Sequence, residues 1–316
     1  MYSMEDQIQK NQISDALEHS YAYIKQQEFE KAETELEKAL GFDFENPETI
    51  SALKCLHFWK DKYQRIAFID TAFERGEYLL KEWRNFSRFL ERIEAATDQC
   101  LYSIRQAVFG TALEEYSGFH RNTETLEPEI LFRIGKCLKG LGDYQHAVEY
   151  IEKASQQKKD DAVVYAELAD CYAFINEVKA AKAFFREALF LDPQAIDLQS
   201  LESLMIRRLI DEVEKKGYVG ELLNEWLPVY GAIYGIFNVK RELRPLEYGK
   251  LRQTIHTLEQ RISTEGLQGA IVPRLINRYF WLIDHYIVIK DTKEKIEEIL
   301  SRIKSLDLEI YTAYVN

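Results

Sequence analysis

The sequence predicts an all-α fold, an α-solenoid of helix–turn–helix repeats that is followed by a divergent helical C-terminal region. Two observations predict this class. First, apolar residues recur at the spacing of one helix face, and over part of the chain this pattern returns with a fixed period of about 34 residues. Second, only 14 glycines and 6 prolines interrupt the 316 residues, which favours long helices over many short strands.

The clearest repeats are two well-formed units that together span residues 128–195. In each unit the first helix carries apolar residues at positions i, i+3 and i+7 around a small residue, and the second helix alternates small with bulky residues. Small residues let two antiparallel helices approach closely, and bulky residues fill the gaps between units. A tight turn is expected at Gly142-Asp143-Tyr144 and at its counterpart Asn176-Glu177-Val178. The matched positions are Leu131, Ile134, Gly135, Leu138, Ala147, Ile151 and Ala154, and then, one repeat later, Tyr165, Leu168, Ala169, Tyr172, Ala181, Phe185 and Ala188.

These residues, with Asp192-Pro193 at the end of the second unit, resemble the tetratricopeptide repeat (TPR), and the resemblance covers about residues 13–195. In the same phase, residues 13–46 match one unit. The next unit starts at Asn46-Pro47, an N-cap followed by proline at the first helical position, and is degenerate, so residues 13–80 hold an N-terminal TPR and a degenerate TPR. Over residues 81–127 the phase is lost but the pattern stays helical, which predicts an elongated TPR-like helical pair.

Residues 196–316 are expected to form a divergent helical region, either a cap for the solenoid or a set of degenerate repeats. Helices are predicted near residues 196–216, 219–237, 246–264, 268–289 and 293–305, and Asp291-Thr-Lys-Glu294 predicts a capping box for the last of them. A faint final unit can be aligned through Phe280, Ile283 and Ile287, then Ile296, Leu300 and Ile303, with its end at Leu306-Asp307-Leu308.

Two stretches of this region, residues 226–237 and 274–286, are dense in apolar and aromatic residues. A helix that is apolar on all faces is either buried or part of an interface. The stretches therefore predict either core packing between long helices or a surface for homo-oligomerisation, which would use Trp226, Tyr230, Phe280 and Trp281. Between them, Lys240-Arg241-Glu-Leu-Arg244 is a local basic cluster, which is either a solvated loop or an anion site.

The formal net charge of −12 is confined to the repeat half of the chain. Residues 1–199 contain 24 Lys and Arg against 36 Asp and Glu, a net of −12, whereas residues 200–316 contain 17 of each, a net of zero. An acidic surface repels phosphate backbones, so we expect no nucleic-acid binding there. The charge either favours a basic partner or serves only to keep the protein soluble.

No catalytic or cofactor-binding motif is present, so we expect neither enzyme activity nor a cofactor. The sequence has no glycine-rich phosphate loop, HExxH or GxSxG motif, and its histidines lack the spacing of metal ligands. The cysteines, Cys55, Cys100, Cys137 and Cys171, each fall in a helical pattern and are expected to be buried thiols. No stretch is long and apolar enough to span a membrane, and no apolar signal segment is present at the start. If Met1 is the native start, the expected location is the cytoplasm.

In the TPR family the first helices of the units line a concave groove that holds an extended peptide or a helix. Carried over to this sequence, the groove positions are Leu17, Tyr21, Ile24, Phe58, Glu129, Phe132, Lys136, Lys139, Asp170 and Phe174. The Lys and Asn pair with which one family subclass grips a C-terminal carboxylate is absent, since those positions read Leu17/Tyr21, Phe132/Lys136 and Ala166/Asp170. The mixture of aromatic and charged residues suits a partly apolar peptide or an amphipathic helix.

These expectations favour a non-catalytic TPR scaffold or adaptor that binds a protein or peptide partner in its concave groove. One alternative is a structural homo-oligomeric protein that assembles through the C-terminal aromatic helices. Another is a regulatory TPR sensor of a small peptide. The chain's own C-terminal helices could also fill the groove and leave no open surface there.

Overall fold

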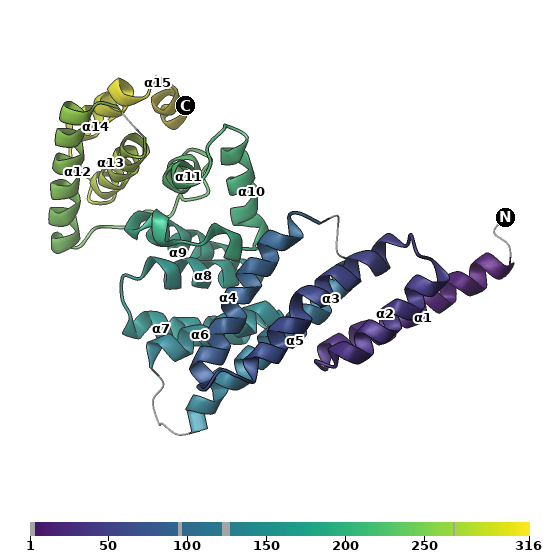
Figure 1. Ribbon diagram of the computed structural model, residues 1–316. Coiled ribbons are helices and arrows are strands. Elements are labelled where there is room, and N and C mark those ends of the chain that lie inside the picture. The colour runs from purple at the N-terminus through teal and green to yellow at the C-terminus, as the bar shows by residue number, and fades with distance from the viewer. Residues whose placement is uncertain (1–3, 94–96, 122–126, 268) are drawn as a thin grey trace. The chain divides into compact units, whose positions relative to one another are not determined.

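The computed structural model describes residues 4–93, 97–121, 127–267 and 269–316, and within these residues the chain is built from α-helices and short 3-10 turns with no strand (Figure 1). This confirms the predicted all-α class. The chain divides into an N-terminal unit, residues 1–154, and a C-terminal unit, residues 155–316, and each is described by itself. The helices are α1 (Met4–Lys25), α2 (Phe29–Phe42), α3 (Pro47–Ile66), α4 (Ala72–Leu90), α5 (Asp98–Ser117), α6 (Pro128–Leu141) and α7 (Tyr144–Gln157), then α8 (Ala162–Phe174), α9 (Val178–Leu191), α10 (Leu204–Glu214), α11 (Glu221–Ile233), α12 (Pro245–Glu265), α13 (Ile271–Val288), α14 (Lys293–Leu306) and α15 (Leu308–Val315).

One type of turn joins the two helices of four pairs, α1–α2, α6–α7, α8–α9 and α13–α14. After α6, Gly142 adopts a left-handed conformation. Its N–H donates a hydrogen bond to the carbonyl of Lys139, and the N–H of Asp143 donates one to the carbonyl of Leu138 at 2.9 Å. This pair of bonds is a Schellman motif, which satisfies carbonyls that the helix end would otherwise leave unpaired. Other residues with positive φ at the same place are Gln27 after α1, Asn176 after α8 and Lys290 after α13, each followed by the corresponding long backbone bond.

The second helices of three pairs also end alike. Asp43 after α2, Asp192 after α9 and Asp307 after α14 have extended backbones with φ near −150°, and the side chain of each accepts backbone N–H groups two or three residues further along. Such an aspartate ends one helix and starts the next turn of chain. The α13–α14 pair thus has the same turn between its helices and the same aspartate after its second helix as the repeat pairs, in line with the faint repeat aligned there.

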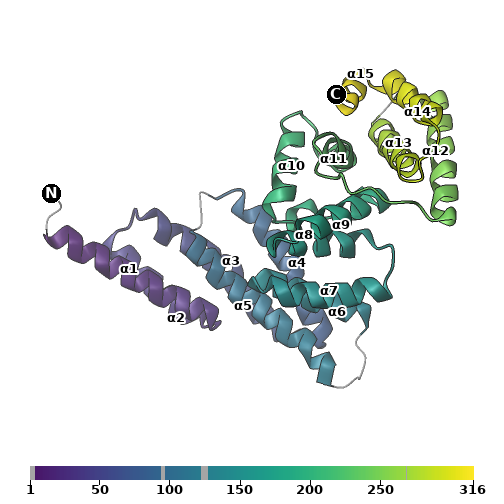
Figure 2. The ribbon, with the colours of Figure 1, turned by 180° about the vertical axis from the view of Figure 1, so that it is seen from behind.

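Helix pairs of the N-terminal unit pack through the small residues of the repeat. In α2 these include Ala32 and Ala39, which are fully buried, and α1 and α2 lie side by side along their length (Figures 1 and 2). At Gly135 in α6 the approach is closer still, because an added Cβ would lie 2.4 Å from Cγ1 of Ile151 in α7. Glycine is therefore required there by space rather than by backbone conformation.

We expect Gly135→Ala to lower the melting temperature of the protein. The added methyl group must displace Ile151 in a packed core, at a cost of about 1–3 kcal/mol, which outweighs the roughly 1 kcal/mol that alanine gains over glycine in a helix. Gly110→Ala in α5 is the matched control, because nothing lies within 4 Å of its Cβ, and it should leave the melting temperature unchanged or raise it. Equal shifts of the two variants in a thermal melt would contradict this account of Gly135.

The middle of the N-terminal unit departs from the expected division. The boundary expected between residues 80 and 81 falls inside α4, which starts at residue 72 after Thr71, an N-cap whose hydroxyl accepts the N–H of Glu74. The following pair is therefore α4 with α5, and at 19 and 20 residues these helices are longer than the 14 residues of α6. A core of aromatic rings packs α3 against α4, with Trp59 and Phe86 fully buried and 5.5 Å apart.

The C-terminal unit is built around α13, which packs against α11, α12 and α14 (Figures 1 and 2). Trp226, Phe280 and Trp281 are buried in this core and Tyr230 is half-buried, so the proposed oligomer surface is corrected to core packing. The ring of Trp281, for example, lies 4.1 Å from Phe190 and 4.5 Å from the guanidinium of Arg186. Of these four aromatic side chains, only Tyr230 exposes a sizeable part of its surface.

Two local predictions for the C-terminal unit are wrong, and one helix is not predicted. The helix expected from residue 196 begins only at Leu204, because residues 193–203 form two 3-10 turns and extended chain. The capping box at residues 291–294 does not form, since the N-cap Thr292 makes no side-chain capping bond. Finally, the sequence pattern does not predict α15, although Asp307 caps its start by accepting the N–H of Ile310.

Candidate partner-binding surface

In the N-terminal unit, the groove positions on α1 are filled by the protein itself. Leu17, Tyr21 and Ile24 are all buried, on a helix that packs against both α2 and α5. The hydroxyl of Tyr21 donates a hydrogen bond to Glu48 at 2.9 Å and lies 3.3 Å from that of Thr97, the N-cap of α5. Burial raises the pKa of Tyr21 above its ordinary value. These three side chains therefore hold helices together.

Phe58, the groove position on α3, is half-buried in the aromatic core of the same unit. Its ring lies 5.1 Å from those of Phe86 and Phe89 on α4, and the ammonium of Lys62 lies 3.8 Å from its centre. A cation so close to an aromatic face stabilises the pair where solvent is partly excluded. A partner could reach only the outer part of this ring.

The four groove positions on α6 share one face of that helix, as their spacing requires. Phe132 and Lys139 are buried, whereas Glu129 and Lys136 are half-buried. The ammonium of Lys136 lies 5.7 Å from the centre of the Phe132 ring, and Glu129 pairs with Arg133 at 2.5 Å. On this face, predicted groove positions of both kinds, charged and aromatic, lie together.

On α8, Phe174 is half-buried but Asp170 is fully buried. One oxygen of the Asp170 carboxylate accepts the N–H of Glu202 and the other accepts the N–H of Ser203, both at 2.8 Å. The hydroxyl of Ser200 donates to Glu167 on the same helix at 2.9 Å. Asp170 thus anchors the chain that leads into α10, and a partner could reach it only by displacing that chain.

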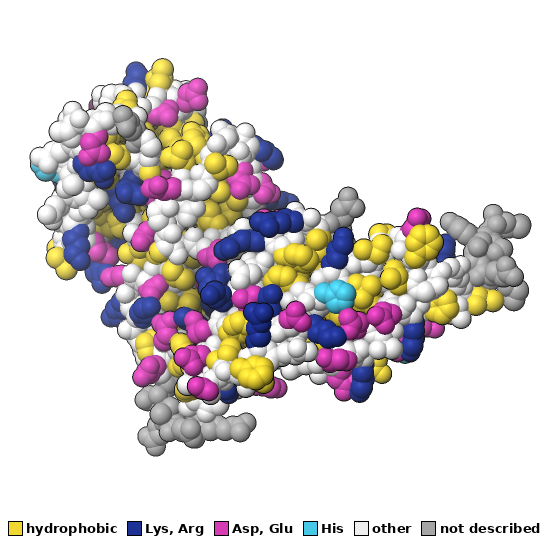
Figure 3. All heavy atoms as spheres, viewed as in Figure 1, with side chains coloured by type: hydrophobic (Ala, Val, Ile, Leu, Met, Phe, Trp, Pro, Cys, Tyr) yellow, Lys and Arg dark blue, Asp and Glu magenta, His cyan; other side chains and the backbone are white. Residues whose placement is uncertain are grey.

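The C-terminal unit contains a cavity of about 490 Å³ that the sequence does not reveal. Most of its wall is apolar and comes from α11, α13, α14, α15 and the segment between α11 and α12. Apolar side chains reach the surface between α11 and α13 (Figure 3). The lining residues are Ala232, Phe237, Asn238, Lys240, Phe280, Ile283, Asp284, Ile287, Ile296, Leu300, Tyr314 and Val315.

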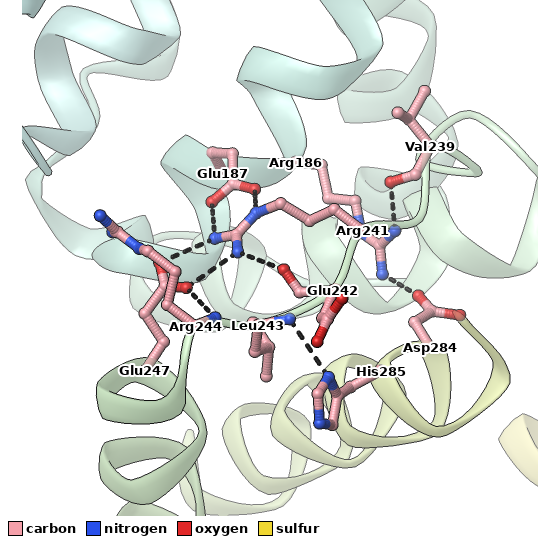
Figure 4. Close-up of polar contacts among 10 residues, drawn as sticks. All are labelled: Arg186, Glu187, Val239, Arg241, Glu242, Leu243, Arg244, Glu247, Asp284 and His285. Carbon is pink, nitrogen blue, oxygen red and sulfur yellow. Dashed lines mark hydrogen bonds and ion pairs between the residues drawn. The ribbon is translucent and has the colours of Figure 1, made fainter. Parts of the chain in front are cut away.

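One end of this cavity carries charge. Asp284, which lines it, is only 5% exposed and accepts a hydrogen bond from the equally buried Arg186 on α9 (Figure 4). Arg186 also donates to the backbone carbonyl of Val239. Lys240 lies at the cavity with its Nζ 3.3 Å from Oδ1 of Asp284. Burial, aided by the charge of Arg186, lowers the pKa of Lys240 below its ordinary value.

Beside this end, the basic residues at 240–244 form ion pairs within the chain. Arg241 donates to both oxygens of Glu187 on α9, at 2.5 and 2.9 Å, and to both oxygens of Glu247 on α12, at 3.0 and 3.1 Å (Figure 4). Glu247 also accepts the backbone N–H and a guanidinium N–H of Arg244. Two bidentate pairs on one arginine fix the linker between α11 and α12 in place.

Glu247 gives the C-terminal unit a predictable dependence on pH. Burial alone would raise its pKa, but the hydrogen bonds from Arg244 and Arg241 outweigh burial and lower the pKa from 4.5 to about 2. A carboxyl with a lowered folded-state pKa stabilises the fold above pH 4.5, and that contribution is lost as the pH falls towards 2. We expect the melting temperature of Glu247→Gln to fall less steeply between pH 5 and pH 2 than that of the natural protein. Glu294→Gln, an exposed position in the first turn of α14, is the control and should keep the natural slope.

The cysteines are poor candidates for chemistry. All four are buried. The neighbouring Cys55 thiol and burial raise the pKa of Cys100, and burial raises that of Cys137 to about 12, so neither is a thiolate near neutral pH. Among the described residues, no group of three His, Cys, Asp or Glu side chains is placed to hold a metal ion, and no helix is long and apolar enough to cross a membrane.

Comparison with known families identifies the repeats. Two family models described as tetratricopeptide repeat match the chain, one over residues 17–46, which cover the C-terminal part of α1 and all of α2, and one over residues 138–205, which run from the end of α6 to the start of α10. No curated protein matches the sequence. Repeats of this family are in general protein-interaction modules without catalytic activity, and their stacked helix pairs present extended binding surfaces. The chain therefore contains recognisable tetratricopeptide repeats, at residues 17–46 and 138–205.

Proposed function

We propose that this protein is a non-catalytic scaffold that binds a protein or peptide partner through the first helices of its repeats. The observation that carries the proposal is the pair of matched repeat segments, each of which contains helices with buried alanines at the repeat positions. In solenoid proteins the apolar residues of each repeat pack against neighbouring helices, and the stacked repeats present an extended surface to a partner.

Within the predicted groove, the face of α6 is the preferred contact. Its half-buried Glu129 and Lys136 flank the ring of Phe132 and offer both charge and apolar surface. An extended peptide or an amphipathic helix with matching side chains would gain from both. By contrast, Leu17, Tyr21, Ile24 and Asp170 are already engaged within the chain, so we assign them to the structure and not to the partner.

The test is the capture of partners from a lysate of the source organism by the immobilised full chain, with the proteins identified by mass spectrometry. We expect the double variant Phe132→Ala/Lys136→Glu to lose most of what the natural protein retains. Tyr150→Ala/Lys153→Glu is the matched control, because Lys153 likewise lies over an aromatic ring on a helix, 5.5 Å from the centre of Tyr150.

Two results would count against the proposal. If both double variants retain the same proteins as the natural chain, the face of α6 is not the contact. If the natural chain retains nothing beyond what an unrelated helical protein retains, the scaffold function itself is wrong.

A further inference from the structure

We propose that the cavity in the C-terminal unit is a second docking site, which takes an apolar segment of a partner protein that also carries an acidic side chain. This inference rests on the proposed scaffold function and names the chemistry of one partner segment. Three observations carry it: the size and lining of the cavity, a buried carboxylate oxygen without a hydrogen bond, and two cations that share one carboxylate at one end.

The cavity has the size and lining of a binding site. Its volume of about 490 Å³ lies within the roughly 300–1,000 Å³ that is usual for ligand sites. Phe280 and Ile283 are buried in its wall, while Ile287 on α13 is 41% exposed. Bulky apolar side chains that enter such a pocket are typical anchors of protein interfaces, because they lose all contact with water on binding.

The wall also contains a buried polar atom that lacks a hydrogen bond. Oδ2 of Asp284 accepts a bond from Arg186, but no group in the described part of the chain donates one to Oδ1. Lys240 is within ion-pair distance of Oδ1 but is not placed to donate to it. A buried carboxylate oxygen without a donor is costly, so a peptide N–H that entered the cavity would remove that cost.

The charges around this end are not balanced. Arg241 and Arg244 are matched by Glu187 and Glu247, as described above. Arg186 and Lys240, however, share the single carboxylate of Asp284, so among these ion pairs one positive charge is unmatched beside an apolar wall. Because the side chain of Lys240 is 39% exposed, a carboxylate that arrives from outside can reach it directly. Charge complementarity therefore favours an acidic occupant over a basic one.

A peptide segment satisfies all three conditions together. Its apolar side chains fill the cavity, one of its backbone N–H groups reaches Oδ1 of Asp284, and an Asp or Glu side chain pairs with Lys240. The main chain supplies hydrogen bonds and the alternating side chains supply selectivity, as in other peptide-binding sites.

The probe is a positional-scanning library of acetylated, amidated dodecapeptides with Leu or Phe fixed at two positions and Glu, Lys or Gln fixed at a third. Binding to the full chain is measured by fluorescence anisotropy. We expect the glutamate pools to bind best, and their affinity to fall about tenfold with Lys240→Gln or Ile287→Glu. The matched controls are Lys250→Gln, an exposed lysine on α12, and Ile289→Glu, which is as exposed as Ile287 but does not line the cavity. Both controls should keep the natural affinity.

Several outcomes would overturn the inference. Stronger binding of the lysine pools would contradict the acidic occupant, and equal losses with the controls would place binding outside the cavity. If sodium decanoate binds in a Lys240-dependent way and no peptide pool does, the ligand is a small amphiphilic acid and not a protein segment. If no pool binds while the lysate capture still depends on Phe132 and Lys136, the scaffold function stands and the second site is wrong. Circular dichroism of each variant checks that the helices are intact.

Discussion

Replacing Asp284 by leucine should lower the free energy of unfolding by about 3–5 kcal/mol, the usual cost of removing one partner of a buried ion pair. Arg186 is 5% exposed, and without Asp284 it would keep only the carbonyl of Val239 as an acceptor. Lys240 would then face Arg186 with no carboxylate between them. The loss should appear in urea unfolding of the full chain and as faster hydrogen exchange of the α9 and α13 amides.

The double variant Arg186→Met/Asp284→Leu separates the cost of an unpaired charge from lost packing. Buried ion pairs can often be replaced by apolar residues of similar size with little change in stability, so most of the loss should be recovered. Arg186→Met alone should cost less than Asp284→Leu, because Asp284 keeps Lys240 at 3.3 Å. If the double variant is no more stable than Asp284→Leu, the loss of stability comes from poor packing of the leucine and not from the unpaired charge of Arg186.

The repeat pattern predicts the helix pairs well because it reports local contacts. Gly135, for example, lies where its own repeat requires a small residue, and its neighbour Ile151 belongs to the very next helix of the chain. The turns at Gly142 and Asn176 are local in the same way. Each residue directly follows the first helix of its unit, where the tight turn requires a left-handed conformation. Both features can therefore be predicted from one repeat compared with the next.

Features that depend on distant contacts could not be predicted in this way. The groove positions Leu17, Tyr21 and Ile24 follow the family pattern, but they are buried, and no pattern in α1 shows that a helix as late in the chain as α5 packs against it. The cavity is equally hidden, because its wall combines residues from 232 to 315 that share no motif. The basic cluster near Arg241 is visible in the sequence and lies beside the cavity. Its partner Glu187, however, lies on α9, far from the cluster in the sequence.

The late start of α10 also depends on a contact between residues that are far apart in the sequence. The sequence from residue 196 has the apolar spacing of a helix, yet Asp170 on α8 accepts the N–H groups of Glu202 and Ser203. These bonds hold the chain in an extended form and leave Ser203 as the N-cap of α10, with φ −63° and ψ 142°. A carboxylate buried in one repeat thus decides where the next helix begins, which is the role of a capping residue supplied from a distance.

Asp170→Ala should therefore cost about 3 kcal/mol, because two charge-assisted hydrogen bonds are lost and two N–H groups remain in a buried setting. Asp170→Asn should cost less, since the amide oxygen can still accept one of them. Asp211→Ala, an exposed carboxylate on α10, is the control and should change stability little. Hydrogen exchange gives the direct measurement, as the amides of Glu202 and Ser203 should lose protection in Asp170→Ala. If Asp170→Ala is instead as stable as Asp211→Ala and loses a bound partner, Asp170 is a groove residue after all, and the structural role assigned to it is wrong.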